Sequence, residues 1–235
     1  MPNSMDHNNL PYHVVRSKRR KTAQISVKAE KIEVRIPEWV SDQWVEQWIS
    51  ERAGWIQRKW NDVNLSSQKF RIEIKPGALI PYLGKNYQLS WQEGKRSGVC
   101  IVEERILVTV SNRSTKPVEE RVKSVLKDWY KNQADTVLKE RLEYWQSEME
   151  LNSNSFKTKG YKRRWGSCSS SGEISFNWKL IFASQDIVDY VVVHEIAHLQ
   201  HMNHSKAFWF LVERYCPQWR SYRKELNKRA AWLEW

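Results

Sequence analysis

The stretch from Tyr190 to Trp209 constrains the fold most, because it holds four of the chain's six histidines. In a helix, His194 and His198 project side by side from one face, at a separation that a single metal ion can bridge. Glu195 then points roughly 100° around the helix, so it can reach a water molecule on that metal without being a ligand. In an H-E-x-x-H motif on a helix, the two histidines bind zinc and the glutamate acts on the metal-bound water, so we predict a zinc site here.

Two histidines compete for the third ligand position, since catalytic zinc takes three protein ligands and leaves one position for water. His201 shares the helical face of the first two, but three ligands along one straight helix would spread over roughly 10 Å at 1.5 Å per residue. His204 lies farther along, where the chain must turn, and Asn203 tolerates the left-handed conformation that such a turn can need. We therefore choose His204.

The helix that carries these residues is expected to be buried. Ser184 is a suitable cap for its first turn. Its apolar positions cover nearly the whole circumference: Ile187, Val188, Val191, Val192, Val193, Ile196, Ala197 and Leu199. Histidines and a glutamate in such a helix are costly unless they are hydrogen-bonded or bind a metal.

The charge balance favours anionic partners. Lysine and arginine number 39 against 27 acidic residues, which gives a net charge of +12 and a pI near 9.6. Nucleic acid, nucleic-acid-bound protein and acidic polypeptide are the partners that such a chain attracts. The most basic run, Arg16 to Lys21, is either a phosphate contact or the solvated edge of a strand.

The N-terminus and the cysteines indicate a cytoplasmic protein with no membrane partner. Residues Met1 to Tyr12 form a polar tail without an apolar signal segment, and no uncharged stretch is long enough to span a bilayer. Three cysteines without a C-x-x-C pair indicate no disulfide framework. Cys168, close to Arg163 and Arg164, is either a reactive thiol or, as we favour, a packed loop residue.

The periodicity predicts an α+β protein in two parts. Residues 1–113 form a β-rich module with one helix, from about 41 to 62, whose tryptophans form a packing face rather than a platform for bases. Its strands are predicted from the alternation of apolar and polar residues at 25–27, 32–36, 70–74, 80–83, 87–91, 99–102 and 106–110.

Residues 114–235 form the second part, a catalytic domain. A long helix from Pro117 to about Glu150 carries one apolar stripe. Two strands, 156–165 and 173–180, flank a loop of small residues at 166–172, and an exposed edge here would hold an extended peptide. Helices at 205–215 and from 219 to about 232 complete the chain.

The motifs resemble those of a known family. The segments that carry the resemblance are Arg164-Trp-Gly-Ser-Cys168, Phe176-Asn-Trp-Lys-Leu180, Asp189 to Leu199 and Asn203-His-Ser-Lys-Ala-Phe-Trp209. They are similar to the YgjP-like zinc metallopeptidases, which are related to the SprT-like and WLM (Wss1-like) groups. The histidine spacing also matches the metzincins, but His201 stands where those have glycine, and no Met-turn follows. The YgjP-like resemblance implies zinc at His194, His198 and His204, with Glu195 as catalytic base in a zincin-like domain.

The function that follows is a zinc metallopeptidase acting on polypeptide, with Glu195 moving the proton. An oxyanion-stabilising group is also expected, and Tyr215, Tyr222, Arg163 and Arg164 remain open for that role. The alternative is a basic, nucleic-acid-associated binding module with a structural or vestigial zinc site. Structural zinc usually has four protein ligands, so an intact Glu195 beside three ligands favours catalysis.

Overall fold

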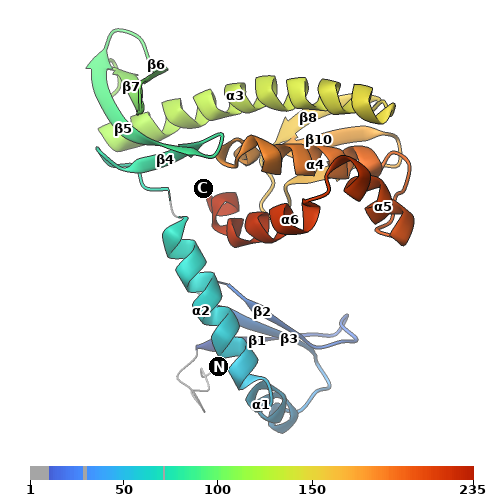
Figure 1. The fold of residues 1–235 in the computed structure, drawn as a ribbon. Coiled ribbons are helices and arrows are strands. Elements are labelled where there is room, and N and C mark those ends of the chain that lie inside the picture. Colours follow the sequence, from blue (N-terminus) through green and yellow to red (C-terminus); the bar gives the residue numbers. More distant parts are fainter. Residues whose placement is uncertain (1–10, 29–30, 71) are drawn as a thin grey trace. The chain divides into compact units, whose positions relative to one another are not determined.

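A computed structural model describes residues 11–28, 31–70 and 72–235. The chain divides into two compact units, Met1–Phe70 and Arg71–Trp235. This division falls earlier than the boundary predicted near residue 113, because the four strands after residue 78 belong to the second unit (Figure 1). The predicted N-terminal tail lies almost wholly outside the described residues. Among the residues that the structure describes, no helix has the length and apolar character needed to cross a bilayer.

The first unit pairs a three-stranded sheet with two helices. Strand β3 (Ile32–Pro37) is central, with β1 (Tyr12–Ser17) parallel to it on one side and β2 (Gln24–Val27) antiparallel on the other. Helix α1 (Asp42–Ser50) and helix α2 (Ala53–Lys69) follow. The single helix predicted over 41–62 is therefore two, because the chain leaves the helical path at Glu51 and Arg52.

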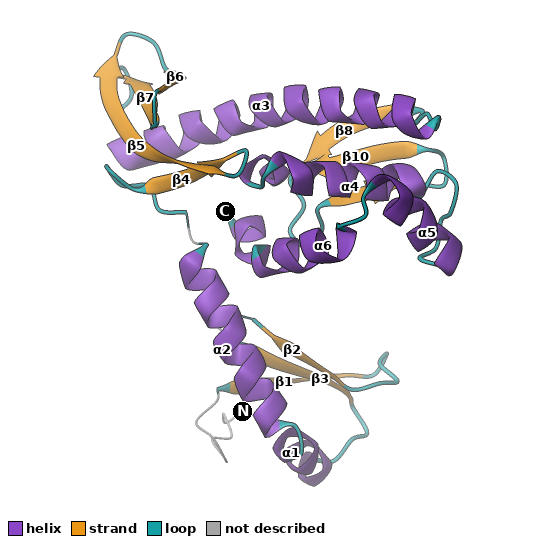
Figure 2. Cartoon of the chain, in the orientation of Figure 1, coloured by secondary structure: helices purple, strands orange, loops and turns teal. Residues whose placement is uncertain are grey.

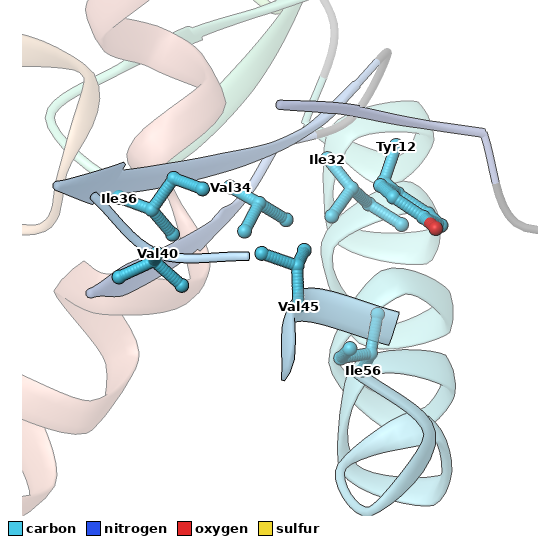
Figure 3. Packing of buried hydrophobic residues seen from close by; sticks show 7 residues of the cluster. All are labelled: Tyr12, Ile32, Val34, Ile36, Val40, Val45 and Ile56. Carbon is cyan, nitrogen blue, oxygen red and sulfur yellow. The ribbon is translucent and has the colours of Figure 1, made fainter. Parts of the chain in front are cut away.

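One apolar core holds this unit together (Figure 3). Alternate residues of β3 face the helices, as the two-residue period of a strand requires. Val45 of α1 and Ile56 of α2 close the core from the helical side. Its members are Tyr12, Ile32, Val34, Ile36, Val40, Val45 and Ile56.

A four-stranded sheet opens the second unit. The strands are β4 (Leu79–Tyr82), β5 (Lys85–Gly94), β6 (Gly98–Val102) and β7 (Arg105–Ser111), in the order β4-β5-β7-β6. All four match predicted strands within a few residues. The strand predicted at 70–74 is not formed at residues 70 and 72–74, and residue 71 lies outside the described part of the chain.

Helix α3 (Val118–Met149) is the longest element and backs the rest of the unit (Figures 1 and 2). Its buried residues recur every four positions from Val122 to Leu142, which confirms the predicted apolar stripe. It contacts β8, α4 and the 3-10 helix that precedes α4. Arg141 fixes α3 to α4 through two hydrogen bonds to Asp189, of 2.5 and 2.9 Å.

A three-stranded sheet and three helices complete the unit. Strand β10 (Glu173–Asn177) lies between β8 (Ser155–Lys159), parallel to it, and β9 (Gly166–Cys168), antiparallel to it. The small-residue loop predicted over 166–172 thus begins as an edge strand, because β10 supplies pairing partners that composition does not reveal.

Helices α4 (Gln185–Ala197), α5 (Lys206–Tyr215) and α6 (Trp219–Lys228) follow this sheet. A 3-10 helix, η1 (Trp178–Phe182), precedes α4, and a second, η2 (Ala230–Glu234), ends the chain. The last predicted helix, 219 to about 232, is therefore divided between α6 and η2.

Candidate metal centre

The centre begins at the end of α4. Nine of this helix's residues are buried, and its sides pack against α3, α5, α6 and β9. His194 lies in the last turn, and His198 follows as the C-terminal cap. Their rings are 5.0 Å apart between centroids, on the same side of the helix, as the four-residue spacing predicts.

The chain then turns and brings His204 back to the first two histidines. Ser205 caps α5 by accepting a hydrogen bond from the backbone of Phe208, so His204 lies directly before the helix. The Nε2 atoms of His204 and His194 are 3.1 Å apart. Asn203 does not have the positive φ that we suggested; its side chain instead accepts a hydrogen bond from the Ser205 amide.

Three histidines therefore form one cluster of potential ligands. One ring nitrogen from each of His194, His198 and His204 lies within 4.8 Å of the others. Ligands at the usual zinc–nitrogen distance in a tetrahedral site are roughly 3.3 Å apart, which this cluster can reach with small side-chain movements. The ring of Phe208 packs against all three imidazoles at 4.6 to 4.9 Å and covers one side of the cluster.

His201 takes part through its backbone. The Nδ1 atom of His198 lies 3.0 Å from the carbonyl oxygen of His201, and only a protonated Nδ1 can donate there. This hydrogen bond fixes the tautomer of His198 and leaves its Nε2 lone pair free to bind a metal. The His201 side chain is not one of the three clustered imidazoles.

The buried imidazoles are held in the neutral form that binds metals. Burial lowers the pKa of His194 to about 3, and the neighbouring charges of His198, His204 and Arg223 act in the same direction. Burial also lowers the pKa of His198. The Nδ1 atom of His194 is buried and has no hydrogen-bond partner among the described residues. The facing Nε2 atoms of His194 and His204 mark the side of the cluster on which neutral imidazoles would bind a cation.

Glu195 lies beside this cluster and is 5% exposed. Burial raises the pKa of its carboxyl group to about 8, although the positive charge of Arg164 opposes the shift. A carboxyl group that titrates near neutrality can both accept and donate a proton. This is the property that a general base requires when it must later act as an acid.

Gly166 makes room for the Glu195 carboxyl group. A Cβ atom added to Gly166 would lie 2.5 Å from Oε1 and 2.8 Å from Cδ of Glu195, which is too close for either group to stay in place. Strand β9 therefore approaches α4 only because this position has no side chain. Sequence reasoning missed this role, although the Arg164-Trp-Gly-Ser-Cys168 segment was the signal that pointed to it.

A buried asparagine holds the loop before β9. The Nδ2 atom of Asn177 donates to the carbonyl oxygens of Tyr161 and Arg164, at 2.8 and 3.0 Å, and its Oδ1 atom accepts from the Lys179 amide. Its backbone amide donates to Trp165 at 2.7 Å. Because Asn177 is fully buried, these bonds fix the course of the chain from Tyr161 to Gly166. This residue too was missed as a part of the site.

The other candidate residues are placed as follows. Arg164 contributes its charge beside Glu195, whereas the Tyr222 hydroxyl is bonded to Gln218 at 3.0 Å and the Tyr215 ring contacts Arg214. Burial raises the pKa of Cys168 to about 11, and the Glu195 charge adds to the shift. That thiol is protonated at neutral pH, in keeping with a packed residue rather than a nucleophile.

Comparison with known proteins identifies the family. Residues 21–229 match the family described as YgjP-like, metallopeptidase domain. The chain belongs to the YgjP-like family. It is therefore a metallopeptidase, and the predicted fold class, α+β with a zincin-like metallopeptidase domain and an N-terminal β-rich module, is confirmed.

The YgjP-like chain was also compared with curated proteins and with solved structures. No curated protein matches the chain significantly. Among solved structures, the metallopeptidase zymogen of Pyrococcus abyssi abylysin aligns with 20% identity over 38% of this chain and 90% of that chain, at a TM-score of 0.36.

The residues of the YgjP-like chain fit a metal ion. The family's activity requires one, and the cluster of His194, His198 and His204 supplies three imidazole nitrogens. The ring of His198, oriented by the hydrogen bond from its Nδ1 to the His201 carbonyl, and the facing Nε2 atoms of His194 and His204 are what a metal-binding cluster is expected to show.

Proposed function

We propose that this metallopeptidase is zinc-dependent and hydrolyses peptide bonds, with the H-E-x-x-H-x-x-x-x-x-H segment as its metal site. The observation that carries the proposal is the convergence of His194, His198 and His204 beside a buried glutamate. Three imidazoles are a common ligand set for catalytic zinc, and they leave a coordination position open. His204 is exposed, so this side of the cluster can receive a substrate.

The residues divide the chemistry among them. When bound, zinc would supply a Lewis acid that polarises the scissile carbonyl and lowers the pKa of water. Glu195 would take a proton from the attacking water and later deliver it to the leaving amine. Gly166 keeps space for the carboxyl group of Glu195, and Phe208 excludes water from one side of the three rings.

We also propose polypeptide as the substrate and the cytoplasm as the place of action. The basic surface, with net charge +12, supports contact with nucleic acid or nucleic-acid-bound protein as a further proposal. The exposed residues Arg19 and Lys21, in the turn between β1 and β2, are candidates for such a contact.

Hydrolysis of denatured casein by the zinc-loaded full chain tests the proposal. Glu195→Gln should lower turnover roughly 10²- to 10⁴-fold, because general acid–base catalysis contributes about that much, while zinc content stays unchanged. Glu148→Gln is the matched control, since Glu148 is exposed on α3, and it should behave as wild type. Full turnover in Glu195→Gln, or no hydrolysis by zinc-loaded wild type, would favour a binding module with structural zinc instead.

A further inference from the structure

Two arginines beside the metal centre lack carboxylate partners. Arg164 lies in the loop between β8 and β9, and Arg223 lies on α6. Within the described ranges, neither guanidinium has an acidic group within 4.0 Å. Some arginines of the same unit are paired, such as Arg141 with Asp189 at 2.5 Å and Arg220 with Glu213 at 2.6 Å. The charge of Arg164 also acts on Glu195 from beyond salt-bridge distance, but no salt bridge neutralises either guanidinium among the described residues.

Each of these arginines is tied to the centre by contacts. The guanidinium of Arg223 lies 5.3 Å from the ring centre of Trp209, and that ring stacks on the His204 ring at 5.5 Å. Arg164 lies two residues before Gly166, the glycine next to Glu195, and its backbone carbonyl accepts a hydrogen bond from Asn177. Arg223 therefore approaches from the histidine side and Arg164 from the glutamate side.

Both guanidinium groups lie over aromatic rings. The guanidinium of Arg164 lies 4.7 Å from the ring centre of Tyr161, and that of Arg223 lies 5.3 Å from the ring centre of Trp209. A ring that contacts the face of a guanidinium leaves its N–H edge directed outward, where it can donate two parallel hydrogen bonds to a carboxylate. Both arginines are exposed, so a substrate can reach these edges.

We propose that Arg164 and Arg223 form an anion-binding pair that selects polypeptide substrates with aspartate or glutamate near the scissile bond. This inference rests on the proposed function, because it assumes that a peptide lies across the centre. A carboxylate on that peptide would be a suitable partner for guanidinium groups that have no salt bridge of their own. Nucleic acid is the competing ligand class, and the test below separates the two.

Binding to matched peptides is the direct test. The zinc-loaded Glu195→Gln chain binds a fluorescein-labelled peptide of alternating alanine and glutamate about tenfold more tightly than its glutamine counterpart, as measured by fluorescence anisotropy. Adding Arg164→Gln or Arg223→Gln brings this ratio towards one. Arg163→Gln and Lys224→Gln are matched controls, because each removes the same charge from a neighbouring exposed residue, and they keep the ratio.

Three results would overturn the inference. The first is equal affinity of the parent chain for the glutamate and glutamine peptides. The second is an equal loss of the affinity ratio in the Arg163 and Lys224 controls. The third is weaker binding of single-stranded oligothymidine, with unchanged binding of the glutamate peptide, in the Arg164 or Arg223 variants. The last result would assign the arginines to nucleic acid.

Cleavage-site mapping separates this inference from the proposed function. Mass spectrometry of casein digested by zinc-loaded wild type should show cuts enriched near acidic residues, and Arg164→Gln or Arg223→Gln should remove the enrichment. Cuts without a preference for acidic residues would contradict only the role of Arg164 and Arg223 in substrate selection. Absence of any hydrolysis would contradict the proposed function itself.

Discussion

The buried residues of the two units differ in kind. The core of the first unit, from Tyr12 to Ile56, is apolar throughout. In the second unit, the buried polar residues among those described all lie between Ser175 and His198: Ser175, Asn177, Lys179, Glu195 and His198. Burying polar groups costs free energy unless they are bonded, so a chain concentrates them where it needs them. The described core of the first unit has only apolar members, whereas this segment of the second unit carries buried polar groups beside the histidine cluster.

Of three substitutions that test this difference, Gly166→Ala, beside the buried Glu195, should have the largest effect. The added Cβ would meet the Glu195 carboxyl group at 2.5 Å, so the carboxyl group or strand β9 must move. Because the proposed general base would be displaced, casein turnover should fall on the order of 10²-fold or more. Gly98→Ala is the control, since a Cβ there meets nothing within 4 Å. Near-normal turnover in Gly166→Ala would show that Glu195 does not need its observed position.

Asn177→Ala should come next, through stability. Three side-chain hydrogen bonds are lost at a fully buried position, at about 1 kcal/mol each. Urea unfolding should show a loss of about 3 kcal/mol for the second unit, and hydrogen exchange should become faster in β9. Asn154→Ala, which removes an exposed amide that donates to Ser171, should cost less than about 1 kcal/mol. Equal losses in the two variants would contradict the role given to burial.

Ile36→Val should have the smallest effect, and this effect should be confined to the first unit. Ile36 is fully buried in the core of the first unit, and removing one methylene there typically costs about 1 kcal/mol. Hydrogen exchange should become faster in residues 11–70, while zinc affinity and turnover stay at the wild-type level. A loss of zinc affinity in this variant would mean that the two units are coupled more strongly than separate cores suggest.

The parts that sequence could predict are those with a local signal. The stripe of α3 and the pairing of His194 with His198 follow from helical periodicity, and His204 follows from the turn expected after the helix. All of these signals lie within a few turns of chain. The contact of Gly166 with Glu195 joins residues far apart in sequence, and no local pattern encodes it. Strand β9 was missed for the same reason, because glycine, serine and cysteine have no strong strand preference and only β10 gives them partners.

The ends of helices and the contacts of backbone carbonyl groups are also hard to predict from sequence. The break between α1 and α2 falls at Glu51 and Arg52, while the nearby Gly54 is already inside α2. Because no glycine or proline stands at the break itself, the tryptophan pattern continues through it. The roles of His201 and Asn177 depend on backbone carbonyl groups brought close by the fold. Such interactions become visible only when the chain's course is known.

Metal content of the purified full chain, measured by mass spectrometry for wild type, His201→Ala and His204→Ala, tests the central claim most directly. We expect about one zinc per chain in wild type. His201→Ala should keep it, because His201 orients His198 through a backbone carbonyl that alanine retains. His204→Ala should lose zinc or bind it far more weakly, since one of three ligands is gone. No zinc in reconstituted wild type, or a loss confined to His201→Ala, would contradict the proposed metal centre.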